Sequence, residues 1–175
     1  MKNRRRTKRE DAMAQEPSSI PSQTPPSAPH VPAFMGLGNM ITTTLLRAGV
    51  RLTAFGHPMY LLTVRGRKSG KPRTTPVVII ELDGRRYLLA PYGIVAWVRN
   101  LRAVGRATLT RGRRAEEVQA VELLNPEAAH VLKRCLAVKM PPFSIAALGV
   151  TANSPFEEIE RATLSHPVFL VQGAT

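Results

Sequence analysis

The sequence predicts an α+β protein, mainly β, in which an antiparallel sheet closes into a barrel with peripheral helices. Three observations support this fold class. Short apolar runs rich in β-branched residues alternate with turn residues. Asp83-Gly84 between two such runs is a strong hairpin signal, because a tight primed turn needs positive φ. Few helical segments separate the strands, and a small sheet loses its exposed edges by closing on itself.

The chain of 175 residues fits one folded domain preceded by an arm. Residues 1–30 combine six basic residues with five prolines among serines, a composition that cannot bury a core. We predict a disordered arm there and a folded domain over 31–175. The basic start lacks the apolar segment of an export signal, and the apolar stretch 31–46 is too short to span a bilayer. We therefore expect a cytoplasmic protein.

The elements of the domain follow in order. Phe34, Leu37, Ile41 and Leu45 have the spacing of one helix face and predict a helix over about 33–48. A loop is expected at 56–58. Apolar runs then predict strands at 59–64, 74–82, 87–90, 107–110, 116–123 and 168–171, and helical patterns cover 96–103, about 126–139 and the segment after Pro155. Asn125 and Ser154, each followed by proline and soon by glutamate, are predicted helix caps.

The balance of charge is strongly basic, with 25 Lys and Arg against 12 Asp and Glu and a net charge of +13. Such a chain favours a polyanionic partner: nucleic acid, anionic lipid, or a ligand carrying phosphates and carboxylates. Cys135 is the only cysteine, so no intrachain disulfide can form, which fits a reducing compartment. The four histidines share no metal-ligand spacing, and no metal is expected.

The densest positive charge lies between two predicted strands, where residues 65–73 (RGRKSGKPR) hold five cations and two glycines. This segment is not a nucleotide-binding P-loop, because only three residues separate its glycines and a proline follows the second lysine. Glycine at these places allows a turn or the close approach of an anion. An exposed hairpin loop with solvated charges is the alternative.

A second candidate cluster combines Ala90-Pro91-Tyr92-Gly93 at a strand end with Trp97 and Asn100 on the next helix, where they could border a flat ring. Alternatively, Trp97 is simply part of the core. The chain has no Gly-x-Gly-x-x-Gly after a strand and no Gly-x-Ser-x-Gly, which disfavours a Rossmann-type nicotinamide site and a serine hydrolase.

Residues 61–76 (LLTVRGRKSGKPRTTP), followed by the Asp83-Gly84 turn, Pro91-Tyr92-Gly93, residues 97–102 (WVRNLR) and residues 166–169 (HPVF), resemble in this order the deazaflavin (F-420)-dependent nitroreductase family. The resemblance covers about residues 33–171. It implies a split β-barrel of the FMN-binding, flavin-reductase type. It also implies the cofactor coenzyme F-420, a deazaflavin with a phosphate and a polyglutamate tail.

The resemblance also implies roles for individual residues. The tail-binding segment falls on Arg67, Lys68 and Ser69, supported by Lys71 and Arg73. The remaining cofactor contacts fall on Thr74, Thr75, Pro76, Val77 and Val78 beside the ring, on Ala90, Pro91, Tyr92 and Gly93 at the barrel rim, and on Trp97 and Asn100. Tyr92 is the candidate catalytic proton donor, and stacking on the ring or substrate is its alternative role.

The chain departs from many members of that family at its rim, where only residues 93–96 stand in place of a longer insertion, and it has no tyrosine after Tyr92. The expected reaction is hydride transfer from reduced F-420 to a quinone, enone or nitro compound. The alternatives are an FMN-binding oxidoreductase of the same fold and a non-catalytic protein that binds polyanions or a membrane surface.

Expected partners are the small acceptor, a second copy in a homodimer, and the anionic inner face of the cell membrane as a peripheral contact. No specific nucleic acid is expected, because no aromatic residues are interleaved with the basic ones.

Overall fold

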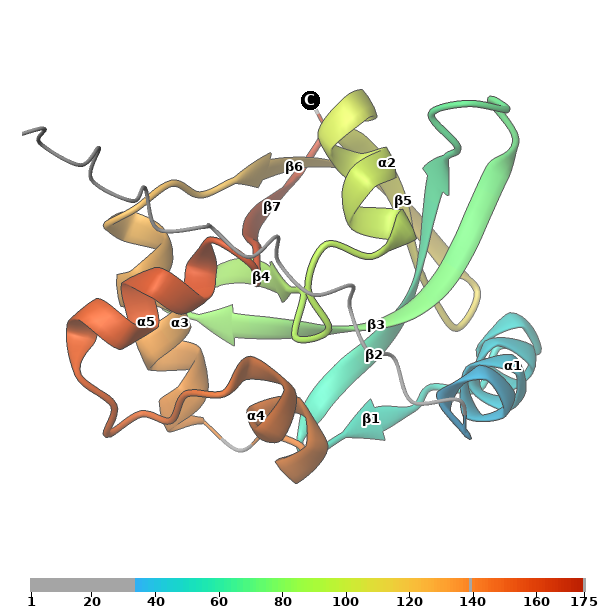
Figure 1. Ribbon diagram of the computed structural model, residues 1–175. Helices are drawn as coiled ribbons and strands as arrows, with labels where there is room; N and C mark the ends of the chain where they lie inside the picture. Colours follow the sequence, from blue (N-terminus) through green and yellow to red (C-terminus); the bar gives the residue numbers. More distant parts are fainter. Residues whose placement is uncertain (1–33, 139, 175) are drawn as a thin grey trace, which may run out of the picture.

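The computed structural model describes residues 34–138 and 140–174 (Figure 1). The predicted arm over residues 1–30 lies outside these ranges. No helix in the described part of the chain has both the length and the apolar character needed to cross a bilayer.

Six strands form a closed antiparallel barrel in the order β2-β3-β4-β7-β6-β5, with β5 pairing back onto β2. A short strand, β1, extends the sheet beyond β2. The strands are β1 (Thr53–Ala54), β2 (His57–Arg65), β3 (Pro72–Leu82), β4 (Arg85–Leu89), β5 (Arg106–Arg111), β6 (Arg114–Glu122) and β7 (Val168–Gly173). The predicted fold class, a mainly β barrel with peripheral helices, is confirmed.

Alternation along the strands builds two cores, since successive side chains point to opposite faces of a sheet. Ile79 lies inside the barrel with Leu62, Leu88 and Phe169. Ile80, the next residue along β3, points outward into a second core beneath the helices. The apolar run of β3 is therefore buried on both sides.

Helices cover one side and one end of the barrel (Figure 1). The second core contains residues of α3 (Glu127–Ala137), α4 (Pro142–Leu148) and α5 (Phe156–Thr163), the helices on the left and lower side of the view. Val98 and Leu101 of α2 (Ala96–Val104) pack into the barrel interior. The first helix, α1 (Phe34–Arg47), lies beside β2 and β3 at the opposite side of the view.

The predicted bounds of the first helix, about 33–48, agree closely with α1, but its apolar spacing left open which side faces the barrel. Ile41 and Leu45 are exposed, and Leu46 is the buried residue. Thr42 and Thr43 are half-buried on the side that faces the protein. The helix thus presents its more polar side to the barrel, which an argument from apolar spacing alone cannot anticipate.

Both predicted helix caps are wrong. The helix after Asn125 begins at Glu127 without a side-chain cap, and the Asn125 amide instead donates to the Glu160 carbonyl and accepts from the Thr163 hydroxyl. The Ser154 hydroxyl accepts from the Thr151 amide within its own turn. Two short elements, β1 and α4, were not predicted, and His57-Pro58 belongs to a strand rather than a loop.

Candidate active site

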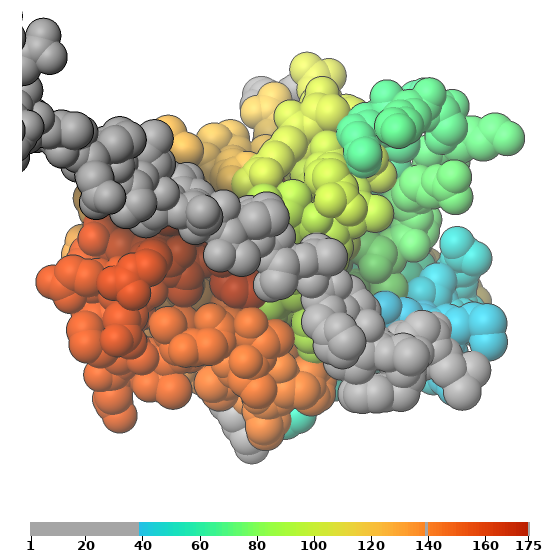
Figure 2. Space-filling view, in the orientation of Figure 1, coloured from blue at the N-terminus to red at the C-terminus, as the bar shows by residue number. Residues whose placement is uncertain are grey.

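The basic segment forms a tight loop between β2 and β3 that projects from the surface next to α2 (Figure 2). The Gly66 amide donates to the Lys71 carbonyl at 2.9 Å, and the Gly70 amide donates to the Gly66 carbonyl at 2.8 Å. A Cβ atom at position 66 would lie 2.9 Å from Ser69 Oγ and 3.3 Å from the Lys71 carbonyl, so any other residue there would displace the Ser69 hydroxyl and crowd the loop. The sequence thus fixes a compact loop that holds several cations close together.

Asn100 anchors this loop to α2. Its side chain is buried, with 6% of the residue exposed, and its Oδ1 accepts from the Arg67 backbone amide at 3.3 Å and from Arg67 Nη1 at 3.4 Å. The three ion pairs in the described part of the chain, Arg86–Glu116, Arg102–Glu122 and Arg134–Asp83, use none of the loop cations. The loop therefore presents positive charge that no described carboxylate neutralises.

One edge of β3 is open beside this loop. Residues 72–78 pair with β2, whereas β4 pairs only with Ile79–Leu82 on the other side. Backbone groups along this first half of β3 therefore face a gap in the barrel wall rather than another strand. A ligand in the gap could accept hydrogen bonds from strand amides.

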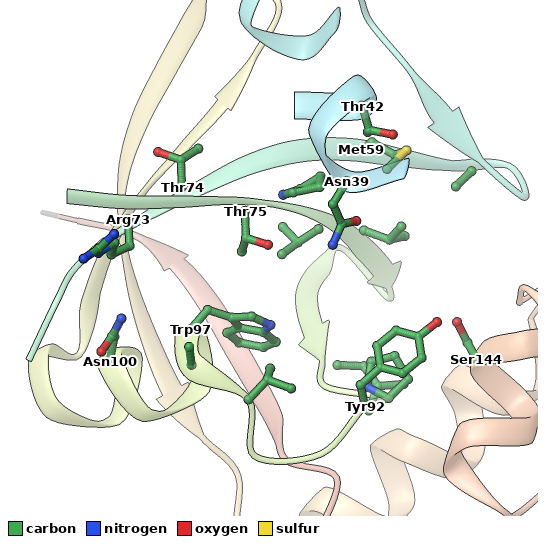
Figure 3. Close-up of a pocket in the computed structure, with 18 of the residues that line it drawn as sticks. Asn39, Thr42, Met59, Arg73, Thr74, Thr75, Tyr92, Trp97, Asn100 and Ser144 are labelled. Atoms are coloured by element: carbon green, nitrogen blue, oxygen red, sulfur yellow. The ribbon is translucent and has the colours of Figure 1, made fainter. Parts of the chain in front are cut away.

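Aromatic side chains from the segment after β4 lie across the gap from β3 (Figure 3). Trp97 packs against Phe169 of the barrel interior, with ring centroids 6.0 Å apart. Tyr92 lies farther along, and its hydroxyl points toward Ser144 of α4. This arrangement gives the gap a flat apolar floor.

The whole gap is a cavity of about 820 Å³. Arg73 and Asn100 lie at one end of it, and Tyr92 and Ser144 lie at the other (Figure 3). The cavity is large enough for a flat cofactor ring and a small second molecule, since ligand pockets commonly enclose about 300–1,000 Å³.

The cavity brings together most of the residues predicted from sequence. Those lining it are Arg67, Lys68, Ser69, Arg73, Thr74, Thr75, Pro76, Val77, Val78, Pro91, Tyr92, Trp97 and Asn100. Lys71, Ala90 and Gly93 are not among the lining residues. Ala90 is buried, and its carbonyl accepts from the Gly93 amide, so these two shape the turn that carries Tyr92.

The far end of the cavity contains residues that sequence reasoning missed. They come from α1, the β1–β2 hairpin, the two residues before α4, and α4 itself: Asn39, Thr42, Ala54, His57, Met59, Met140, Pro141, Phe143 and Ser144. These residues are widely separated along the chain and form no motif. The proline pair before Phe143, which opens α4, is the one local signal that a helix starts there.

The Tyr92 hydroxyl is buried and has no hydrogen-bond partner within the described residues. Burial raises the pKa of Tyr92 above its ordinary value. The Ser144 hydroxyl, toward which the Tyr92 hydroxyl points without meeting hydrogen-bond geometry, partly offsets this increase. Tyr92 is therefore a neutral O–H group at any physiological pH.

The described residues contain no group of three or more His, Cys, Asp or Glu side chains that could hold a metal ion. The donors that the cavity does offer are cations, hydroxyls and backbone amides. They suit an organic anion with a flat ring.

Comparison with known proteins identifies the family. Residues 40–148 match the family model of the F-420H(2)-dependent quinone reductases. The chain belongs to this family. It is accordingly an F-420-dependent oxidoreductase, and its cofactor is coenzyme F-420. The unpaired cations and the flat floor of the cavity fit the charged tail and the ring of that cofactor.

Solved structures with detectable similarity are distant. An F-420-H2-dependent reductase (FDR-A) is 26% identical over 65% of this chain and 93% of its own, with a TM-score of 0.41. A structure described as a domain-swapped dimer is 22% identical, over 80% of this chain and 100% of its own, with a TM-score of 0.46. An FAD-binding protein from Mesorhizobium loti is 16% identical over 78% and 88%, with a TM-score of 0.38.

Proposed function

We propose that this protein reduces a small electrophilic acceptor, foremost a quinone and otherwise an enone or nitro compound, within the deazaflavin-dependent nitroreductase group. The observation that carries the proposal is one continuous cavity with unpaired cations at one end and a mainly apolar chamber at the other. Such a cavity suits a charged cofactor whose ring meets an uncharged partner. When bound, reduced F-420 supplies the hydride.

The basic loop holds the anionic tail in this proposal. Arg67, Lys68 and Arg73 line the cavity, and Lys71 lies on the same loop. Charge-assisted hydrogen bonds from these groups to phosphate and carboxylate are stronger than neutral ones. Asn100 fixes the Arg67 main chain, so part of this charge is positioned before the cofactor arrives.

The open half of β3 binds the ring. Backbone amides in the stretch from Thr75 to Val78, where Pro76 has none and only alternate amides point to the open edge, polarise the ring carbonyls. Such preorganised donors cost no reorganisation during reaction. Trp97 provides the opposite face. Together they exclude water from the reacting side of the ring.

Tyr92 acts at the acceptor. Its hydroxyl is neutral and lacks a partner among the described residues, so it can donate to an oxygen of the acceptor once a side-chain movement exposes it. That hydrogen bond stabilises the negative charge that develops on the acceptor oxygen as the hydride arrives.

The test is a titration of the protein with F-420, followed by Trp97 fluorescence. We expect saturable binding that weakens at least about 100-fold in the double variant Arg67→Ala/Lys68→Ala, because hydrogen bonds to charged groups contribute about 1.5–3 kcal/mol each. The matched control is Arg113→Ala/Arg114→Ala, which removes the same charge from the β5–β6 turn.

The control variant should bind F-420 within about threefold of the wild type, a difference of less than 1 kcal/mol. Equal weakening by both double variants would mean that total charge rather than the loop drives binding. FMN serves as a competitor in the same titration. Displacement of F-420 by equimolar FMN would favour the FMN-binding alternative.

A contact with anionic membrane is a second proposal, favoured by the exposed face of α1. Met40, Ile41 and Leu45 are 61%, 53% and 41% exposed, and Arg47 follows in the last turn. Exposed apolar residues next to cations suit insertion at the level of lipid head groups. Sedimentation with phosphatidylglycerol vesicles should fall for Met40→Ser/Ile41→Ser. Unchanged sedimentation would exclude a role for this face.

A further inference from the structure

The β1–β2 turn has an unusual residue in a demanding backbone conformation. Ala54 pairs with His57, so Phe55 and Gly56 are the two residues of a tight hairpin turn. Both have positive φ, 53° for Phe55 and 88° for Gly56. A bulky residue in the left-handed region is rare and strained, and turns of this kind prefer Asn, Asp or Gly at that place.

A second hairpin of the same molecule has the residue types usually found in a turn with positive φ. Leu82 pairs with Arg85, and the two turn residues are Asp83 and Gly84, with φ of 50° and 71°. The backbone is almost the same, yet this turn uses the residues that the conformation favours. It lies at the far end of β3 from the basic loop, and neither of its turn residues lines the cavity.

The strained phenylalanine instead lies at the edge of the cavity. The residues on either side of the turn, Ala54 and His57, both line the cavity. The Phe55 ring meets Phe143 of α4 edge-on, with centroids 6.4 Å apart and planes at 78°. Phe143 lines the cavity as well and is 51% exposed, while Phe55 is 39% exposed.

Strain of this kind persists where the surroundings impose it, and an exposed aromatic pair gains little from burial. Asn at position 55 would make the turn more stable. A polar side chain would also suit this partly exposed position, so neither the turn nor the surface requires phenylalanine there. What Phe55 and Phe143 share is their place where the apolar end of the cavity meets solvent. Phe143 lines the cavity, whereas Phe55 does not line it and packs against the Phe143 ring. A flat ring in that end would therefore contact Phe143, with Phe55 behind it.

We propose that Phe143, held in place by Phe55, forms an aromatic edge that selects acceptors with fused rings by packing against the ring farthest from the reacting centre. This inference rests on the proposed function and specifies the acceptor end of the same cavity. A single-ring acceptor is too short to use the edge. The pair is therefore a determinant of specificity and not part of the cofactor site.

The experiment compares menadione, which has two fused rings, with 1,4-benzoquinone, which has one, as acceptors for reduced F-420. In Phe55→Asn we expect kcat/KM for menadione to fall about three- to tenfold, the effect of losing one aromatic contact. The value for benzoquinone should stay within about twofold. The melting temperature should rise by about 2–4 °C, because Asn tolerates the left-handed region.

Two further variants separate specificity from stability. Phe143→Leu should shift the menadione-to-benzoquinone ratio in the same direction without raising the melting temperature, since Phe143 lies in a helix. Asp83→Asn, at the corresponding place of the other turn, should leave the ratio unchanged.

The F-420 titration keeps the two proposals distinguishable. If the wild type binds F-420 and reduces both quinones, an unchanged ratio in Phe55→Asn and Phe143→Leu overturns the aromatic edge alone. If the wild type fails to bind F-420, the proposed function fails and the edge with it. Loss of both quinone activities together with loss of F-420 binding in Phe55→Asn would also overturn the inference, because the residue would then act on the cofactor site.

Discussion

The two ends of the cavity are encoded in different ways. The cationic end comes mainly from one run of nine residues, 65–73, closed by its own backbone hydrogen bonds. The other end is assembled from α1, the β1–β2 hairpin, the segment after β4, and α4. The first end carries charge for a ligand of fixed chemistry, and the second is mostly apolar. Binding of the cofactor and choice of acceptor should therefore respond to separate substitutions.

The largest effect that would sharpen this comparison is expected for Asn100→Asp. A carboxylate in place of the amide would pair with Arg67 and compete with the anionic tail, while still accepting from the Arg67 amide. We expect F-420 affinity to fall at least about tenfold, equivalent to about 1.4 kcal/mol, with an unchanged or higher melting temperature. Fluorescence titration and thermal unfolding measure the two quantities.

Gln119→Glu is the control, because it makes the same charge change at an exposed position on β6. If this variant weakened F-420 binding as much as Asn100→Asp does, a local effect on Arg67 would be ruled out. A fall in the melting temperature of Asn100→Asp would show that the buried site does not accept the charge.

The next effect concerns the other end of the cavity. In Tyr92→Phe we expect kcat/KM for menadione to fall about three- to tenfold, because one neutral hydrogen bond contributes about 0.5–1.5 kcal/mol. The affinity for F-420 should not change. The melting temperature should stay the same or rise, since the hydroxyl has no partner in the described structure. A clear loss of stability would instead reveal a structural hydrogen bond from this hydroxyl.

Prediction from sequence succeeded where local chemistry determines structure. The Asp83-Gly84 turn, the strand on each side of it and the basic loop follow from residues that are neighbours in the chain. Trp97 and Asn100, one helical turn apart, both line the cavity. The turn, its two strands and the basic loop depend on contacts within about ten residues, whereas Asn100 also needs Arg67, 33 residues away.

What sequence reasoning missed involves contacts across the fold. The spacing of Ile41 and Leu45 predicts a helix but not which side is buried, and α1 turns Leu46, Thr42 and Thr43 toward the barrel. Asn125 bonds with Thr163 and Glu160 of a helix more than thirty residues away instead of capping its own helix. Phe143 and Ser144 reach the cavity only because α4 packs against the second core. Hydrophobic spacing identifies an apolar face of a helix, but it does not show whether that face is buried or which element it packs against.

The smallest effect concerns His166, which supports the rim between the two ends. Its Nδ1 lies 3.4 Å from the Ala90 carbonyl, and burial lowers its pKa below 6.5 despite the carbonyls of Ala90 and Pro91. The unfolded chain therefore takes up a proton first as the pH falls below about 6.5, so the folded state loses stability until the pH reaches the lowered pKa.

His166→Gln should flatten this pH dependence. We expect the decrease in melting temperature between pH 7 and pH 5 to shrink by no more than about 4 °C relative to the wild type. Thermal unfolding over this range measures it. An unchanged slope would show that His166 does not contribute to the acid sensitivity of the fold.

The open half of β3 also bears on whether two copies of the chain can associate by strand pairing. A strand with a free edge is a template onto which another chain can add, and natural sheets protect such edges with proline and charge. Here the open stretch begins with Pro72 and Arg73 and contains Pro76, so two of its positions have no amide to donate. Pro72, Arg73 and Pro76 therefore make it unfavourable for a strand of another chain to pair with the open edge of β3. We therefore expect the cofactor-free protein to resist intermolecular strand pairing along this edge of β3.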